Sequence, residues 1–336
     1  MGRAKKTQKT LTLSQLKQKL FYYRALADTY EAIQKLRIAC SNRLTAIHKL
    51  GLDEEEKLRE RTLSSIVDEL LEQEKRIIKI VKEILKEIPI YNEFLKKIKG
   101  IGPALSLRLL SINWDLNKKL SDWNAYAGLV PYVYKCKCQK GHKLLLPYNP
   151  EKRKEEIKCY VITEREKKKK GGSIILDREK MKRCGAPVRI GEIAPCRKHS
   201  GYKIFWNPKA KKTLWLISTS LAKSGKFYKI FYEYWREKYL KEKLSLPHAV
   251  ARAKRKVAKL FLAHFYEAWH EIEGMSYELP YQFEYLKHSP DRLLDWKIII
   301  KVEEGEIEIE DFEEFEKEVS ESKSEDKEKM EKVLKK

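Results

Sequence analysis

Apolar residues are distributed along this chain in a way that predicts helices at both ends and an irregular middle. From Leu11 to Leu50 they recur every three or four residues, as on one face of an amphipathic helix. A second such segment runs from Asp53 to Ile88, with Gly51 between the two. The inward positions of the first segment are Leu16, Leu20, Tyr23, Ala27, Tyr30, Ile33, Leu36, Cys40, Leu44 and Ile47. Those of the second follow a heptad spacing with one polar interruption: Leu63, Val67, Leu70, Glu74, Ile77, Val81, Ile84 and Ile88. This pattern predicts either a long helical hairpin or an intermolecular coiled coil that would make the protein a homo-oligomer.

Two glycines interrupt the helical pattern directly after these segments, in the sequence Ile98-Lys99-Gly100-Ile101-Gly102-Pro103. Glycine allows a tight turn with positive φ, and Pro103 suits the first position of a new helix. Backbone N–H groups at a helix start can bind an anion. The pattern is typical of a helix-hairpin-helix that holds a DNA phosphate without reading bases, or of an ordinary tight turn between helices. Residues expected to contact DNA here are Lys96, Lys97, Lys99, Gly100, Ile101, Gly102 and Arg108.

The middle of the chain loses helical periodicity. After a short helix that Ser121 is expected to cap and Gly128 to end, five β-like runs follow, separated by turns and by the charged tract Glu164–Lys170. The runs are Tyr132–Tyr134, Lys143–Leu146, Ile157–Ile162, Ser173–Leu176 and Val188–Ile190. This segment has little apolar material for a core of its own, so we expect a bound metal ion to stabilise it.

Five of the six cysteines lie in this middle segment, a grouping that favours metal binding over disulfides in a chain without a secretory signal. Tetrahedral zinc takes four thiolate or imidazole ligands. The predicted structural zinc site uses Cys136, Cys138, Cys184 and Cys196, with His142, Cys159 and His199 as alternative ligands. The spacings match no standard pair of cysteines, and the alternative is a set of reduced thiols.

Helical periodicity returns from Ala210, again from Lys226 to Lys243, and again from Pro247 to Ile272. Beyond Gly274, Trp296–Val302 is strand-like, and the acidic end after it is expected to be a helical or unstructured tail. The fold class is therefore mainly α, with an inserted small β-rich zinc-binding module. The expected divisions are a basic arm at 1–10, the hairpin or coiled coil at 11–90, the helix-hairpin-helix at 91–131, the Cys-rich module at 132–199, a second helical part at 200–274 and a C-terminal extension at 275–336.

Charge narrows the class of partner. The 336 residues carry a formal charge of +23, and from Glu303 onward there are 15 acidic and 7 basic residues, so the first 302 residues carry +31. A polyanion, nucleic acid first, is the expected partner, and Arg252, Arg255 and Lys256 are candidate phosphate contacts. No apolar run is long enough to span a bilayer, and no signal peptide is recognisable. We expect a cytoplasmic, nucleoid-associated protein without membrane contact; its abundant Lys, Glu and Ile with scarce Gln is typical of hyperthermophiles.

Three segments in a fixed order resemble the C-terminal transposase domain of the insertion sequence 110 family of transposases. They are LKKIKGIGPALSLRLL from Leu95, LSDWNAYAGLVP from Leu120 and HAVARAKRKVAKLFL from His248. The resemblance implies a DNA-binding protein of transposition or recombination, in which a Ser-Gly pair, here Ser200-Gly201, carries a serine nucleophile that attacks a DNA phosphodiester. The candidates for stabilising charge beside it are Lys198, His199, Lys203 and Lys209, of which Lys203 and Lys209 are also expected to contact DNA.

The chain also differs from the family in two respects. The family's RNase-H-fold domain, with four acidic metal ligands, has no counterpart in these residues, and Tyr132–His199 stands where the family has a short loop. Ser200 is therefore expected to act only with an RNase-H-like subunit supplied in trans. One alternative is a non-enzymatic architectural protein of a mobile element or virus that binds duplex DNA. Another is a scaffold for structured RNA, in which the aromatic, basic segment Phe227–Tyr239 stacks on bases.

Overall fold

The computed structural model describes residues 13–49, 54–148, 157–164, 167–170, 173–176, 182–277 and 295–309. The basic arm and the acidic tail from residue 310 lie outside the described residues. The chain divides into two compact units: residues 1–119 with 212–336, and residues 120–211. The second unit begins before and ends after the expected module at 132–199, because the short helix at Leu120 and the segment after Ser200 belong with the sheet.

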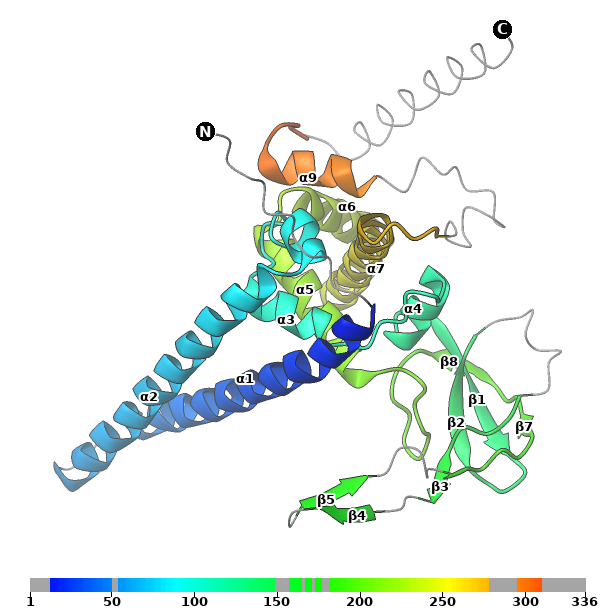
Figure 1. Cartoon of the computed structure of the whole chain (residues 1–336), viewed down its shortest axis with the longest axis horizontal. Helices are drawn as coiled ribbons and strands as arrows, with labels where there is room; N and C mark the ends of the chain where they lie inside the picture. The colour runs from blue at the N-terminus through cyan, green and yellow to red at the C-terminus, as the bar shows by residue number, and fades with distance from the viewer. Residues whose placement is uncertain are drawn as a thin grey trace, which may run out of the picture. The chain divides into compact units, whose positions relative to one another are not determined.

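The first unit starts with the two long helices that the apolar spacing predicts. Helix α1 (Leu13–His48) and helix α2 (Glu54–Leu85) pack against each other in opposite directions (Figure 1). Glu74, the polar interruption of the seam, is buried and paired with Arg37, whose Nε lies 2.5 Å from its Oε1. This partner explains how a carboxylate occupies an inward position. Leu36, expected inward, is instead 50% exposed.

The remaining helices of this unit form a bundle with an aromatic core. They are the π-helical turn η1 (Tyr91–Leu95), α3 (Pro103–Leu110), α5 (Pro208–Ser224, whose first turn lies in the second unit), α6 (Phe227–Lys241), α7 (Leu246–Ile272) and α9 (Trp296–Glu304). Phe94 stacks on Phe261 of α7 and meets Trp296 of α9 edge-on, with both pairs of ring centres 6.0 Å apart. From Phe261 to His270, α7 is buried on all sides, so it is the central helix of the bundle.

Helix α9 corrects one expectation, because Trp296–Val302 is not a strand. Its β-branched residues favour a strand locally, but Asp295 caps a helix by accepting a hydrogen bond from the Lys297 N–H at 2.8 Å. Gly305, with φ of 86°, ends that helix. Trp296, Ile299 and Ile300 lie at helical spacing and are buried, and α9 packs against α6 and α7. Packing of this face outweighs the local strand preference.

The second unit is a small sheet preceded by helix α4 (Leu120–Tyr126). Its strands are β1 (Tyr132–Cys138), β2 (Lys143–Pro147), β3 (Ile162–Glu164), β4 (Lys167–Lys170), β5 (Ser173–Leu176), β6 (Lys182–Arg183), β7 (Val188–Arg189) and β8 (Ile193–Pro195). Strand β1 is central and pairs antiparallel with β2, β7 and β8. Strands β3 and β6 form one further pair, and β4 and β5 another.

Local details of this unit differ from expectation in three places. Helix α4 begins at Leu120, so Ser121 lies inside it and is not its cap. Gly128 ends the helix as expected with φ of 65°, and Trp206 packs where a side chain would stand. The run Ile157–Ile162 contributes only its last residue to a strand, and the lysine run Lys167–Lys170 of the charged tract forms β4.

Candidate metal centre and nucleic-acid interface

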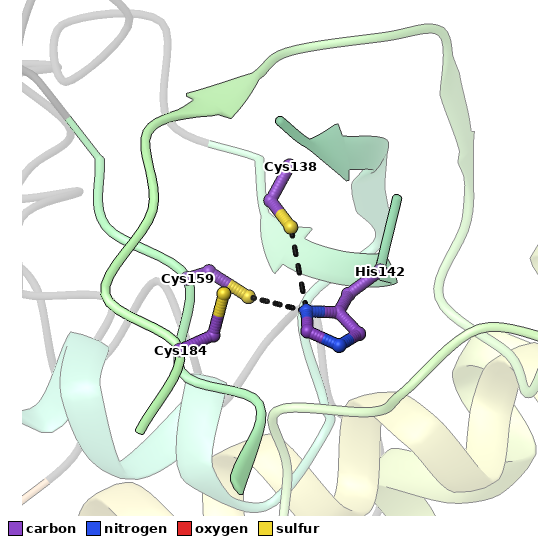
Figure 2. Close-up of side chains that lie close together, drawn as sticks. All are labelled: Cys138, His142, Cys159 and Cys184. Carbon is purple, nitrogen blue, oxygen red and sulfur yellow. Dashed lines mark hydrogen bonds between the residues drawn. The ribbon is translucent and has the colours of Figure 1, made fainter. Parts of the chain in front are cut away.

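Four metal-binding side chains come together in the second unit. They are Cys138 at the end of β1, His142 in the turn before β2, Cys159 in the segment before β3, and Cys184 after β6 (Figure 2). One sulfur or ring nitrogen of each lies within 4.8 Å of those of the other three. Cys138 and Cys159 are buried, whereas His142 and Cys184 are half-buried. Cys138 and His142 lie in one turn, whereas Cys159 and Cys184 come from distant parts of the sequence, so the fold of the unit creates the cluster.

Two glycine turns position these side chains. In the first, the Gly141 N–H donates to the Cys138 carbonyl at 2.9 Å, and the Cys138 N–H donates to the His142 carbonyl at 3.0 Å. In the second, the Gly185 N–H donates to the Cys159 carbonyl at 3.0 Å, which joins Cys159 to the turn that carries Cys184. Gly141 and Gly185 have φ of 82° and 65°, values that side chains disfavour. Each turn therefore presents one pair of ligands toward the other.

The distances and the donor types suit a tetrahedral metal ion. The His142 Nδ1 atom lies 3.4 Å from the Cys138 Sγ and 3.8 Å from the Cys159 Sγ. With Zn–S and Zn–N bonds of about 2.3 and 2.0 Å, tetrahedral zinc separates sulfur from nitrogen by roughly 3.5 Å. Three thiols and one imidazole also form a frequent structural zinc set. The cluster can thus hold a metal ion, and its chemistry is compatible with zinc.

The pKa values of the Cys138 and Cys159 thiols are shifted in opposite directions. Burial alone would raise the pKa of Cys138, but the N–H groups of His142 and Lys140 and the neighbouring thiols hold that pKa below its usual value. Burial, with a further contribution from the neighbouring thiols Cys138 and Cys184, raises the pKa of Cys159 to about 11, while the Val161 N–H lowers it in part. Cys138 therefore ionises more readily than Cys159, and a cation would favour the thiolate form of both.

Only half of the quartet expected from the sequence lies in this cluster. Cys138 and Cys184 are joined by the two alternatives His142 and Cys159. Cys136 is buried near Tyr134 and Leu144, and burial raises its pKa. The remaining two lie elsewhere: Cys196 is buried with Val133, Leu145 and Trp206, and His199 has its Nε2 atom 3.1 Å from the Pro195 carbonyl. The glycine beside His142 and the glycine beside Cys184 are the sequence signal that favours this set.

In the first unit, the paired glycines form the expected turn between η1 and α3. Gly100 has φ of 97°, and a Cβ there would stand 2.5 Å from the Ser224 Oγ, so only glycine fits. Its carbonyl accepts a hydrogen bond from the Ser220 Oγ at 2.6 Å. Gly102 is exposed, with open space where a side chain would point. The first hydrogen bond of α3 is from the Ser106 N–H to the Gly102 carbonyl at 3.0 Å. The N–H groups of Ala104 and Leu105 therefore precede the helical ladder.

One backbone N–H of this turn already holds an anionic side chain of the same chain. The buried Glu303 of α9 accepts hydrogen bonds from the Lys99 N–H at 3.2 Å and from the Lys226 and Phe227 N–H groups at 3.1 Å. Sequence reasoning missed this contact because Glu303 was assigned to the acidic tail. Lys97 lies 3.8 Å from the neighbouring Glu304. An external anion would therefore meet the turn at Gly102 and the start of α3, not at Lys99.

Arg108 borders a groove of about 390 Å³ at the start of α3. Its Nη2 donates to the Gln34 Oε1 at 2.9 Å, and its guanidinium lies 5.7 Å from the centre of the Tyr30 ring. Lys223 of α5 lines the same groove. A further basic group, formed by Arg252, Arg255 and Lys256, lies on the first half of α7. Of these three, Arg252 and Arg255 are exposed and Lys256 is half-buried.

Ser200 lies in the second unit, exposed in the turn that joins His199 to Tyr202, where Gly201 has φ of 76°. Lys203 and Lys209 are exposed in the same unit. The Lys203 N–H donates to the Lys143 carbonyl at 3.0 Å, which ties this turn to β2. The serine is therefore accessible from solvent, in a turn with a basic surrounding.

No described helix has both the length and the apolar character needed to cross a lipid bilayer. In comparisons with known proteins, no family model matches the chain, and no curated protein is significantly similar to it.

Proposed function

We propose that this chain binds DNA and acts in transposition or recombination, in the manner of the C-terminal part of an insertion-sequence transposase. The turn at Gly100 and Gly102 would hold a backbone phosphate, with Lys96 and Arg108 nearby. Zinc would bind Cys138, His142, Cys159 and Cys184 in a structural role. A second copy of the chain would pack along α1 and α2 as a coiled coil, for which the exposed Ile38, Ile66 and Ile80 offer apolar surface.

The observation that carries the DNA-binding proposal is the contrast between the two glycines. Gly100 is required by the fold, because its positive φ and the close Ser224 leave no room for a side chain. Gly102 has no such requirement, since its φ of −83° and ψ of 173° are open to every residue type and nothing stands near it. A glycine that the fold does not need, before a proline and the first amides of a helix in a cationic unit, suits close approach of a phosphate.

Replacing Gly102 by aspartate tests this proposal. Aspartate is a good helix N-cap, so we expect the melting temperature of Gly102→Asp to equal or slightly exceed that of the wild type. Its carboxylate would occupy the amides of Ala104 and Leu105 and repel a phosphate, so we expect affinity for a 30-base-pair duplex to fall by about tenfold or more at low salt, roughly 1.4 kcal/mol. The readout is fluorescence anisotropy of labelled duplex.

The matched control is Asn113→Asp, which adds the same charge at an exposed position beyond the other end of α3. Equal duplex affinities for these two variants would show that Gly102 is only a structural turn. If the wild-type chain does not retain duplex at low ionic strength, the whole proposal of DNA binding fails.

Catalysis by Ser200 is a separate proposal that depends on an RNase-H-like partner. With that partner supplied, we expect strand cleavage of supercoiled DNA, measured on agarose gels, to be lost in Ser200→Ala because the nucleophilic oxygen is absent. Cleavage that persists in this variant would leave a DNA-binding protein without a serine nucleophile. A preference for folded RNA over duplex in competition at fixed salt would favour the scaffold alternative.

A further inference from the structure

Basic side chains lie on aromatic rings along the face shared by α6 and α7. The Lys256 Nζ is 4.0 Å from the centre of the Trp235 ring, and the Lys238 Nζ is 5.0 Å from that centre. The Arg252 guanidinium is 5.7 Å from the centre of the Tyr239 ring. We call Trp235, Lys238, Tyr239, Arg252 and Lys256 the cationic platform. Its two helices pack against each other, so it is part of a rigid surface.

The rings of this platform support cations and are not free to stack on bases. The Trp235 ring carries both lysines and packs against Phe231 and Tyr239, with centres 6.2 and 5.6 Å apart. Tyr239 is itself buried. The aromatic residues at the start of α6, Phe227, Tyr228, Phe231 and Tyr232, belong to the core. Most of the aromatic character of Phe227–Tyr239 therefore serves packing and cation support.

Two ammonium groups of the platform also lack a carboxylate partner among the described residues. Lys238 and Lys256 share one indole, and neither forms an ion pair with a carboxylate within the part of the chain that the structure describes; Lys238 reaches the Tyr234 hydroxyl at 3.4 Å. Burial lowers the pKa of Lys256, and the charge of Lys238 lowers it further. Two ammonium groups beside one indole repel each other where no described carboxylate pairs with them. An oxyanion between them would remove that repulsion.

We propose that the cationic platform binds the phosphodiester backbone of duplex DNA, with a phosphate between Lys238 and Lys256. This inference rests on the proposed DNA binding and adds a contact surface separate from the Gly100–Gly102 turn. Because aromatic rings already restrict Lys256, Lys238 and Arg252, fewer side-chain conformations are lost on binding than with free surface lysines. Contacts made only to phosphates carry no sequence information, so this surface adds affinity for any duplex.

The test is Lys256→Met, which keeps the apolar stem over Trp235 and removes the charge. In the free protein we expect a higher melting temperature than in the wild type, because the repulsion with Lys238 and the cost of burying the ammonium are gone. We expect affinity for a 30-base-pair duplex to fall about five- to tenfold at low salt. The slope of log affinity against log salt should become shallower by about one, since one phosphate contact is lost. Lys238→Gln should give a similar loss.

Lys75→Met is the matched control, because Lys75 is an exposed lysine paired with Glu72 at 2.7 Å on α2. Duplex affinity and salt slope of Lys256→Met equal to those of this control would overturn the inference. A lower melting temperature of Lys256→Met with unchanged duplex affinity would also overturn the inference. Loss of binding in Gly102→Asp together with wild-type binding in Lys256→Met would retain the turn and reject the platform. Wild-type binding in Gly102→Asp together with loss of binding in Lys256→Met would retain the platform and reject the turn.

Discussion

Single buried carboxylates in this protein have partners that the sequence pattern does not reveal. Glu74 interrupts an apolar seam and is held by Arg37, while Glu303 joins three backbone N–H groups from two distant segments. Glu303 connects the Lys99 turn to the start of α6, where a carboxylate also complements the positive end of the helix dipole. A residue that the composition assigned to an acidic tail therefore stabilises the cationic unit.

Substitution of Glu303 should test this role. Glu303→Ala leaves the buried Phe227 N–H and the partly buried Lys226 N–H without this acceptor, so we expect the free energy of unfolding to fall by about 2–3 kcal/mol. Glu303→Gln keeps one carbonyl acceptor and should lose less. Urea denaturation followed by circular dichroism at 222 nm measures both. A loss in Glu303→Ala no larger than that of an exposed glutamate on α2, such as Glu83→Ala, would contradict the assignment.

Burial raises the pKa of Glu303, although the Lys226, Lys99 and Phe227 N–H groups lower it in part. A carboxyl group with a higher pKa in the folded state binds its proton more tightly there. Its contribution to stability is therefore fully present below its unfolded pKa and decreases as pH rises through the folded value. The stability of the wild type relative to Glu303→Gln should thus be greater at pH 4 than at pH 7, and the reverse trend would mean that the amides outweigh burial.

At the scale of elements, the long helices and four of the five short β-like runs were predictable, whereas α9 and β4 were not. The expected helices at Ala210, Lys226 and Pro247 correspond to α5, α6 and α7 within two residues at their starts, because a long amphipathic period averages over local preference. Trp296–Val302 was misassigned since a short β-branched run has no such average and α9 depends on packing. Strand β4, formed by Lys167–Lys170, has no hydrophobic signal at all; it exists only by pairing with β5.

The candidate metal site was likewise predictable only in part. Cysteine clustering was enough to predict that metal-ligating side chains gather in the middle segment, and four of them do. The ligand set was not predictable from spacing, since Cys159 and Cys184 meet Cys138 and His142 only after the sheet has formed. Cys136 and Cys138 are two residues apart on β1, and nothing in the sequence shows which of them faces the other ligands. The turn glycines Gly141 and Gly185 were the local clue.

On the scale of the whole molecule, the two units differ in the size of their apolar cores. The first has an aromatic bundle core around Phe94, Phe261 and Phe265, and among its described residues there is no comparable Cys/His cluster. The second has short strands and two small apolar clusters around Val133 and Tyr134. A unit with so little apolar core gains proportionally more from a bound ion, since metal binding contributes directly to the free energy of folding.

Removal of the metal ion should therefore destabilise the second unit and not the first. We expect purified protein to contain about one zinc ion per chain, and Cys159→Ser to contain much less, because one of four ligands is lost. Cys196→Ser is the matched control: that thiol is equally buried but lies outside the cluster, so metal content should be retained.

After chelation, protease should cut within residues 120–211 while the helical signal at 222 nm is largely kept. Metal loss in Cys196→Ser with retention in Cys159→Ser would restore the quartet expected from the sequence. Full protease resistance after chelation would show that the ion does not stabilise this unit.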